Sequence, residues 1–74
     1  FKSIRRVIAE WLGLDYDWMR REPLAINKFG LTNRETMDII YKAAVAALRR
    51  VEVEGVEKVE EILTEELGKL GVRI

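Results

Sequence analysis

The chain has 74 residues with 13 basic and 13 acidic side chains, a formal net charge of zero, and neither cysteine nor histidine. A chain of this length buries only about 60% of the surface that it exposes when unfolded, so residues 1–74 hold one small domain. The absence of cysteine and histidine excludes disulfides and ordinary zinc sites, and it leaves poor material for acid–base catalysis. Glutamine is absent and 35% of the residues are charged, a composition typical of thermostable proteins and also of computational designs.

Hydrophobic residues make up 49% of the chain, which is enough for a core. The longest purely apolar run extends from Ala43 to Leu48, whereas a membrane-spanning helix needs about 20 residues. No signal-peptide pattern opens the sequence. We therefore expect no membrane partner and a cytoplasmic location.

Residues 2–12 are predicted to form the first helix, because their apolar residues recur at the spacing of one helical face. The charged residues of the segment fall mostly on the other side, so one face should pack against a core. Gly13 suits the left-handed residue just beyond a helix end. The apolar face contains Ile4, Val7, Ile8, Trp11 and Leu12.

One or two short helical turns are predicted between residues 15 and 30. Asp15 or Asp17 can cap the first of them at its N-terminus. Pro23 ends that turn, because the residue before a proline is pushed out of helical geometry. A second short helix is then expected over residues 24–29, closed by Gly30.

The main helix is predicted over residues 32–54. Thr32 and Glu35 form a capping-box pattern at its start, and Gly55 is placed to end it. Residues 51–54 alternate between valine and glutamate, which is a strand pattern, but the residues after Gly55 change to helical spacing, so the helix is retained.

The last helix is predicted over residues 56–69, with an apolar stripe along one side. The expected fold class is therefore all-α: a compact array of three longer helices (about 2–12, 32–54 and 56–69) with one or two short helical turns between 15 and 30. The stripe of the last helix contains Val56, Val59, Leu63, Leu67 and Leu70.

The main helix is apolar on two sides. A wide stripe forms the expected core face, and a second row lies on nearly the opposite side. A helix of this kind either lies at the centre of its domain or shares one face with a partner. We expect self-association into a homodimer through this second row, and the alternative is a central helix wrapped by the others. The core face contains Met37, Ile40, Tyr41, Ala44, Ala47, Leu48 and Val51, and the self-association row contains Ile39, Ala43, Ala46 and Val53.

Charge is divided unevenly along the chain. Residues 1–34 carry seven basic and four acidic side chains, a net charge of +3, and residues 35–74 carry six basic and nine acidic, a net charge of −3. Basic residues interleaved with aromatic ones can bind phosphates and unpaired bases. Against a nucleic-acid partner stands the overall charge of zero, since such domains are often strongly basic. The candidate nucleic-acid contacts are Lys2, Arg5, Arg6, Arg20 and Arg21.

Two short segments are similar to parts of LuxR-type helix-turn-helix domains. Leu31-Thr32-Asn33-Arg34-Glu35 resembles the opening of such a domain, and Lys69-Leu70-Gly71-Val72 resembles a segment near its end. The family would imply DNA binding by a recognition helix. Here residues 43–48 place strong helix formers where the family has its glycine turn, so we do not transfer that function.

Two acidic patterns invite a metal-site interpretation. Asp15-Tyr16-Asp17 has the form of some metal–phosphate sites, but both aspartates are explained by helix capping. Glu57, Glu61 and Glu65 share one helical face, but they lack the histidine that helical di-metal sites usually add. We therefore expect no catalytic residues, no metal and no cofactor.

The sequence thus predicts a small non-enzymatic helical module that acts through protein–protein contacts and self-associates. One alternative is a nucleic-acid-binding or transcription-regulatory domain that uses the basic N-terminal half. Another is a designed or engineered helical protein without a natural function.

Overall fold

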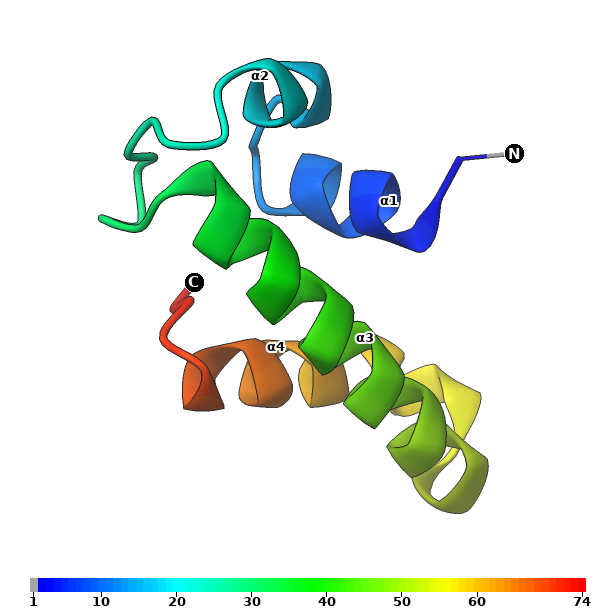
Figure 1. The fold of residues 1–74 in the computed structure, drawn as a ribbon. Coiled ribbons are helices and arrows are strands. Elements are labelled where there is room, and N and C mark those ends of the chain that lie inside the picture. Colours follow the sequence, from blue (N-terminus) through cyan, green and yellow to red (C-terminus); the bar gives the residue numbers. More distant parts are fainter. Residues whose placement is uncertain (1) are drawn as a thin grey trace.

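The structure is a computed structural model that describes residues 2–74, and it is all-α, as predicted. In Figure 1 the longest helix, α3, crosses the molecule diagonally, with α1 and α2 on one side of it and α4 on the other. The elements are α1 (Ile4–Trp11), α2 (Tyr16–Arg21), α3 (Asn33–Glu54), the short 3-10 helix η1 (Val56–Lys58) and α4 (Val59–Lys69).

Side-chain caps fix where the helices begin. The backbone N–H of Glu35 donates to Thr32 Oγ1 at 3.1 Å, and the N–H of Thr32 donates to Glu35 Oε1 at 3.3 Å, which confirms the predicted capping box of α3. Of the two candidate caps for α2, Asp15 is the one used: its side chain accepts from the N–H of Trp18 at 3.1 Å. Gly55, at a φ of 106°, ends α3 as expected.

The second short helix predicted over residues 24–29 does not form, so α2 is the one short helix between residues 15 and 30. The chain makes successive turns there instead and folds back on itself, with Asn27 N donating to Leu31 O at 2.9 Å. The side chain of Asn27 competes with helix formation, because its Oδ1 accepts the backbone N–H of Phe29 at 3.0 Å.

A buried polar network explains why this loop keeps its shape. Asn27 Nδ2 donates to Thr36 Oγ1 at 2.7 Å and to Asn33 Oδ1 at 3.1 Å. Asn33 Nδ2 donates to the carbonyl of Glu22 at 2.7 Å, and Thr36 Oγ1 donates to the carbonyl of Thr32 at 2.9 Å. Among the described residues no buried side-chain nitrogen or oxygen lacks a partner. The network therefore ties the loop to the first turn of α3 without the cost of unpaired polar atoms.

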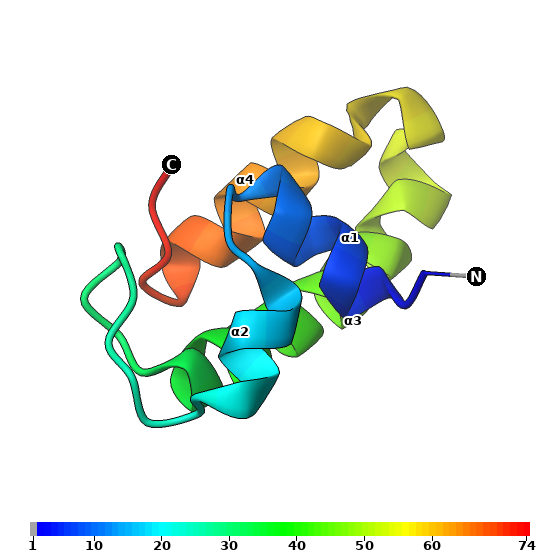
Figure 2. The ribbon, with the colours of Figure 1, turned by 90° about the horizontal axis from the view of Figure 1, so that it is seen from above.

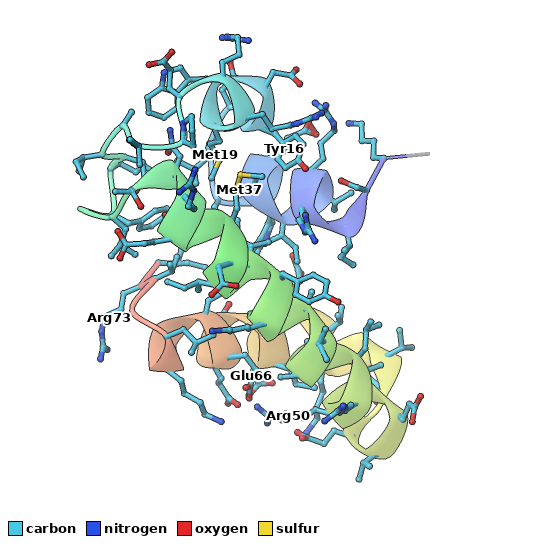
Figure 3. The ribbon with its side chains drawn as sticks, in the orientation of Figure 1. Tyr16, Met19, Met37, Arg50, Glu66 and Arg73 are labelled. Atoms are coloured by element: carbon cyan, nitrogen blue, oxygen red, sulfur yellow. The ribbon has the colours of Figure 1, made fainter. Side chains whose placement is uncertain are left out.

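The core lies where α1, α2 and the first part of α3 meet the end of α4. Met19 from α2 is fully buried, and Figure 3 shows it beside Met37 of α3. Val72, just beyond α4, closes the core from the other side. The buried cluster consists of Ile8, Ala9, Leu12, Leu14, Met19, Ile40, Ala43, Ala44, Leu67 and Val72.

The helices differ greatly in length, and this decides which part of α3 is covered. At 1.5 Å per residue, α3 extends roughly 33 Å and α1 only about 12 Å. Within residues 2–74, α1 and α4 each pack against α3 but not against one another. Both run from right to left in Figure 1, but seen from above in Figure 2 they diverge, α1 slanting toward the upper left and α4 toward the lower left. The C-terminal half of α3 is therefore left as an open floor between them.

None of the helices in residues 2–74 is both long enough and apolar enough to cross a lipid bilayer.

Candidate functional site

An apolar groove with a volume of about 360 Å³ runs between α1 and the start of α4, above the C-terminal half of α3. Figure 2 shows the three segments that surround it. We call it the α1–α4 groove. Its walls are Ile4, Val7, Ile8 and Trp11 on one side and Val56, Val59, Glu60 and Leu63 on the other, and its floor is Ala44, Ala47, Leu48 and Val51.

Two of the four floor residues of the groove carry small side chains. Ala44 and Ala47 are buried, and a methyl group at each position leaves room that a larger residue would fill. The side chains around these two alanines are large and apolar, and they are exposed by 40% at Trp11 and 60% at Leu48. The exposed large apolar residues that line the groove are Ile4, Val7, Trp11, Leu48, Val56 and Val59. Contiguous exposed apolar patches of this kind mark interaction sites on soluble proteins.

The two walls carry opposite charge. The N-terminal segment with α1, residues 2–12, has three basic and one acidic side chain, a net charge of +2. The segment of η1 and α4, residues 56–69, has five acidic and two basic side chains, a net charge of −3. Glu60 is the one charged residue among those that line the groove, and no ion pair within residues 2–74 includes it.

The predicted self-association row does not form one outer surface. Ala43 has no exposed surface and lies in the core, so its assignment to an interface was wrong. Ile39 is half-buried against the same core, and Ala46 is also half-buried. Val53 alone projects fully, with 87% of its surface exposed. The first part of α3 is thus a central helix, because neighbouring helices cover more than one of its sides.

The stripe predicted as the core face of α3 is buried only in part. Ile40, Ala44 and Ala47 are buried, whereas Leu48 is exposed and Val51 is half-exposed in the groove. The sequence signal that could have found this was the mismatch between a first helix of about eleven residues and a main helix of about twenty-three, since the shorter cannot cover the longer.

The candidate nucleic-acid contacts are divided between two places. Lys2 Nζ lies 3.0 Å from Glu10 Oε1, and the Arg5 guanidinium stacks 4.8 Å above the ring of Tyr41 on α3. These contacts hold both cations against the body of the molecule.

The other three basic candidates gather around Asp17. Arg6 donates to its two carboxylate oxygens at 2.9 and 3.3 Å, and Arg20 and Arg21 border a shallow depression beside it. The hydrogen bond from Arg6 holds the pKa of Asp17 below its ordinary value. Of these three arginines, Arg6 is therefore paired within the molecule.

A network of ion pairs on α3 and α4 sets the position of one groove wall. Arg50 on α3 reaches Glu54 on its own helix at 2.8 Å, and Glu65 and Glu66 on α4 at 2.8 and 2.9 Å. Lys69 Nζ lies 3.0 Å from the same Glu66 oxygen. None of these residues lines the groove, so the network can hold α4 on α3 without occupying the site.

Within residues 2–74, no group of three or more acidic side chains is placed to hold a metal ion. No family model, no curated protein and no solved structure matches this chain.

Proposed function

We propose that this chain is a non-enzymatic protein-interaction module and that the α1–α4 groove is its binding face. The observation that carries the proposal is the gathering of exposed large apolar side chains around an alanine floor. Covering these side chains removes apolar surface from water, which is the main favourable term in protein association.

The lining of the groove favours a protein over a small substrate. Small-molecule and catalytic sites combine apolar walls with several placed polar groups that orient the ligand. Here Glu60 is the one charged side chain among the residues that line the groove. Apolar side chains projecting from another polypeptide match this chemistry without needing such groups.

The nucleic-acid alternative has less support. Lys2 and Arg6 have acidic partners within the chain, and Arg5 stacks on Tyr41. Phosphate binding would have to compete with these contacts.

Site-specific photo-cross-linking tests the proposed binding face. A benzophenone amino acid replaces Leu48 or Val56, which are exposed in the groove, and matched controls replace Leu24 or Val53, which are exposed outside it. The variants are irradiated in expressing cells and as concentrated purified protein. We expect polypeptide adducts at the groove positions and few at the controls. Equal labelling at all four positions, or none in the groove, would contradict the proposal.

A further inference from the structure

Building on the proposed function, we infer that the partner in the α1–α4 groove is an amphipathic α-helix of another polypeptide. Its apolar face enters the groove, and a basic residue beside that face meets the α4 wall. Three properties of the site support the inference: the helical origin of its lining, the spacing of the lining residues, and the unpaired negative charge along one edge.

The backbone around the groove favours a helix over an extended peptide. Every lining residue belongs to α1, α3, η1 or α4, so most of the backbone N–H and C=O groups there bond within their own helices. Residues 2–74 contain no strand whose edge an extended peptide could join, since the bridge between Ile26 and Thr32 is isolated in the loop before α3. An extended segment would therefore bury backbone polar groups without partners, whereas a helix bonds its own.

The lining has the spacing of two helical turns. Each of three segments contributes four residues at positions i, i+3, i+4 and i+7, from Ile4 to Trp11, from Ala44 to Val51 and from Val56 to Leu63. Such a set covers roughly 11 Å along a helix at 1.5 Å per residue. A partner helix with apolar residues at the same spacing presents a face of equal length, which is the usual way in which a groove recognises a helix.

The cations of the α1 wall already have contacts within the chain. Lys2 pairs with Glu10, and Arg5 stacks over the ring of Tyr41. Arg6 pairs with a carboxylate of α2. The α1 wall therefore offers a partner mainly its apolar side chains.

The α4 wall, in contrast, has acidic groups left for a partner. Glu60 lines the groove, and Glu57 and Glu61 lie within one turn of it. All three are exposed, and none belongs to an ion pair within residues 2–74. Residues 56–61 carry these three acidic side chains and one basic, Lys58, a net charge of −2, and Lys58 does not line the groove. Electrostatic complementarity therefore selects a partner with lysine or arginine beside its apolar face.

An unbiased peptide selection tests the class of partner. A library of random peptides of about 16 residues, just over four helical turns, is displayed on phage and selected on the purified chain. Counter-selection on Leu48→Asn removes peptides that bind elsewhere, and Val56→Asn replaces that variant if circular dichroism shows it unfolded. We expect the enriched peptides to share apolar residues at i, i+3, i+4 and i+7 with lysine or arginine beside them. Enrichment of alternating, proline-containing or acidic sequences, or no enrichment, would overturn the inference.

Titration of the most enriched peptide, synthesised with a fluorophore, tests the apolar contact. Circular dichroism should show that the peptide gains helix on binding. Leu48→Asn should bind it at least about tenfold more weakly than the wild type, because a large apolar side chain leaves the groove. Leu24→Asn makes the same change at an exposed position outside the groove and should bind like the wild type. Equal affinities for these two variants would place the binding site elsewhere.

The same titration tests the charge. Glu60→Lys should weaken binding about fivefold at low salt, and high salt should remove most of the difference. Glu22→Lys is the matched control, because Glu22 is exposed and lies outside the groove. If Glu60→Lys binds the peptide as tightly as the wild type, the basic character of the partner is wrong.

The outcomes separate this inference from the proposed function. Groove-dependent peptides that stay non-helical when bound, together with cross-links at Leu48 and Val56, refute the helix but leave the interaction module in place. A wild type that sediments as a dimer while Leu48→Asn is a folded monomer means that a second copy occupies the groove, and this also refutes the inference. Neither groove-dependent peptides nor cross-links would contradict both proposals.

Discussion

Arg50 Nη1 lies 2.9 Å from Glu66 Oε2, and this ion pair joins α3 to α4 beside the groove; Figure 3 shows the two side chains approaching each other. The side chain of Glu66 is only 12% exposed, and Lys69 approaches the same oxygen. Because one guanidinium also reaches Glu54 and Glu65, a single residue connects three carboxylates from two helices. The position of the α4 wall of the groove therefore depends partly on residues that do not line the groove.

This network predicts a loss of stability in acid. Hydrogen bonds from Lys69 and then Arg50 lower the pKa of Glu66 below 4.5, and Arg50 does the same for Glu54. A carboxyl group whose pKa is lower in the folded than in the unfolded state stabilises the fold at any pH above its unfolded-state pKa. That contribution disappears as the pH falls through the folded-state pKa. Urea unfolding followed by circular dichroism should therefore show a midpoint that falls below pH 4.5.

Arg50→Met should make the acid dependence of the unfolding midpoint shallower and should lower that midpoint at neutral pH. Arg49→Met is the control and should match the wild type, because Arg49 is exposed and takes part in none of the ion pairs of residues 2–74. Part of the dependence should persist, because Arg6 also lowers the pKa of Asp17. An Arg50→Met variant with the wild-type pH profile would contradict the role given to this network.

The buried asparagine network should be sensitive to single changes. Asn27→Ala removes the donor to Asn33 and Thr36 and leaves the buried Asn33 Oδ1 without that partner. We expect a loss of roughly 1–3 kcal/mol in the free energy of unfolding, measured by urea titration. Lys28→Ala, its exposed neighbour, is the control and should change little. Equal effects from both variants would mean that the loop is not held by this network.

The capping box provides a test of where α3 begins. Thr32→Ala removes the acceptor for the N–H of Glu35 and should cost about 1 kcal/mol. Thr64→Ala is a matched control, because this exposed hydroxyl bonds a carbonyl within α4 instead of capping a helix. The comparison uses unfolding midpoints, and a larger effect at Thr64 would refute the assignment.

The central position of α3 predicts opposite results for two residues of one sequence row. Ala43→Glu places a charge in a site with no exposed surface and should prevent folding, as seen by loss of helical circular dichroism. Val53→Glu adds the same charge at an exposed site and should leave the fold intact. A folded Ala43→Glu variant would show that this part of α3 is not in the core.

The basic N-terminal half should bind nucleic acid only weakly. Titration with a fluorescent single-stranded oligonucleotide at physiological salt should give no affinity tighter than about 10⁻⁴ M. Reversing Arg20 and Arg21 to glutamate should change nothing detectable; they are the two basic candidates with neither an ion pair nor a cation–π contact in residues 2–74. Sub-micromolar binding that falls steeply with salt and is lost in this variant would favour the nucleic-acid alternative.

The positions of the longer helices could be predicted because their signals are local. Thr32 and Glu35 lie three residues apart, and the bonds between them form within a single turn. The apolar spacing of residues 2–12 and the left-handed preference of Gly55 likewise depend on neighbouring residues alone. Chain length limits the fold to one small domain, and the lack of cysteine and histidine limits the possible chemistry, because both follow from composition without any knowledge of packing.

The loop and the groove depended on contacts between distant residues. Asn27 contacts Thr36, nine residues away, and this overrode the local preference for a short helix at residues 24–29. A helical wheel shows which side chains share a face of α3, but not how far along the helix its neighbours extend. Ala43 and Leu48 both belong to apolar rows, yet one is buried and the other exposed, because α1 is too short to cover the end of α3. The groove therefore forms where the shorter helix leaves the longer one uncovered. The extent of this cover follows only from the tertiary structure.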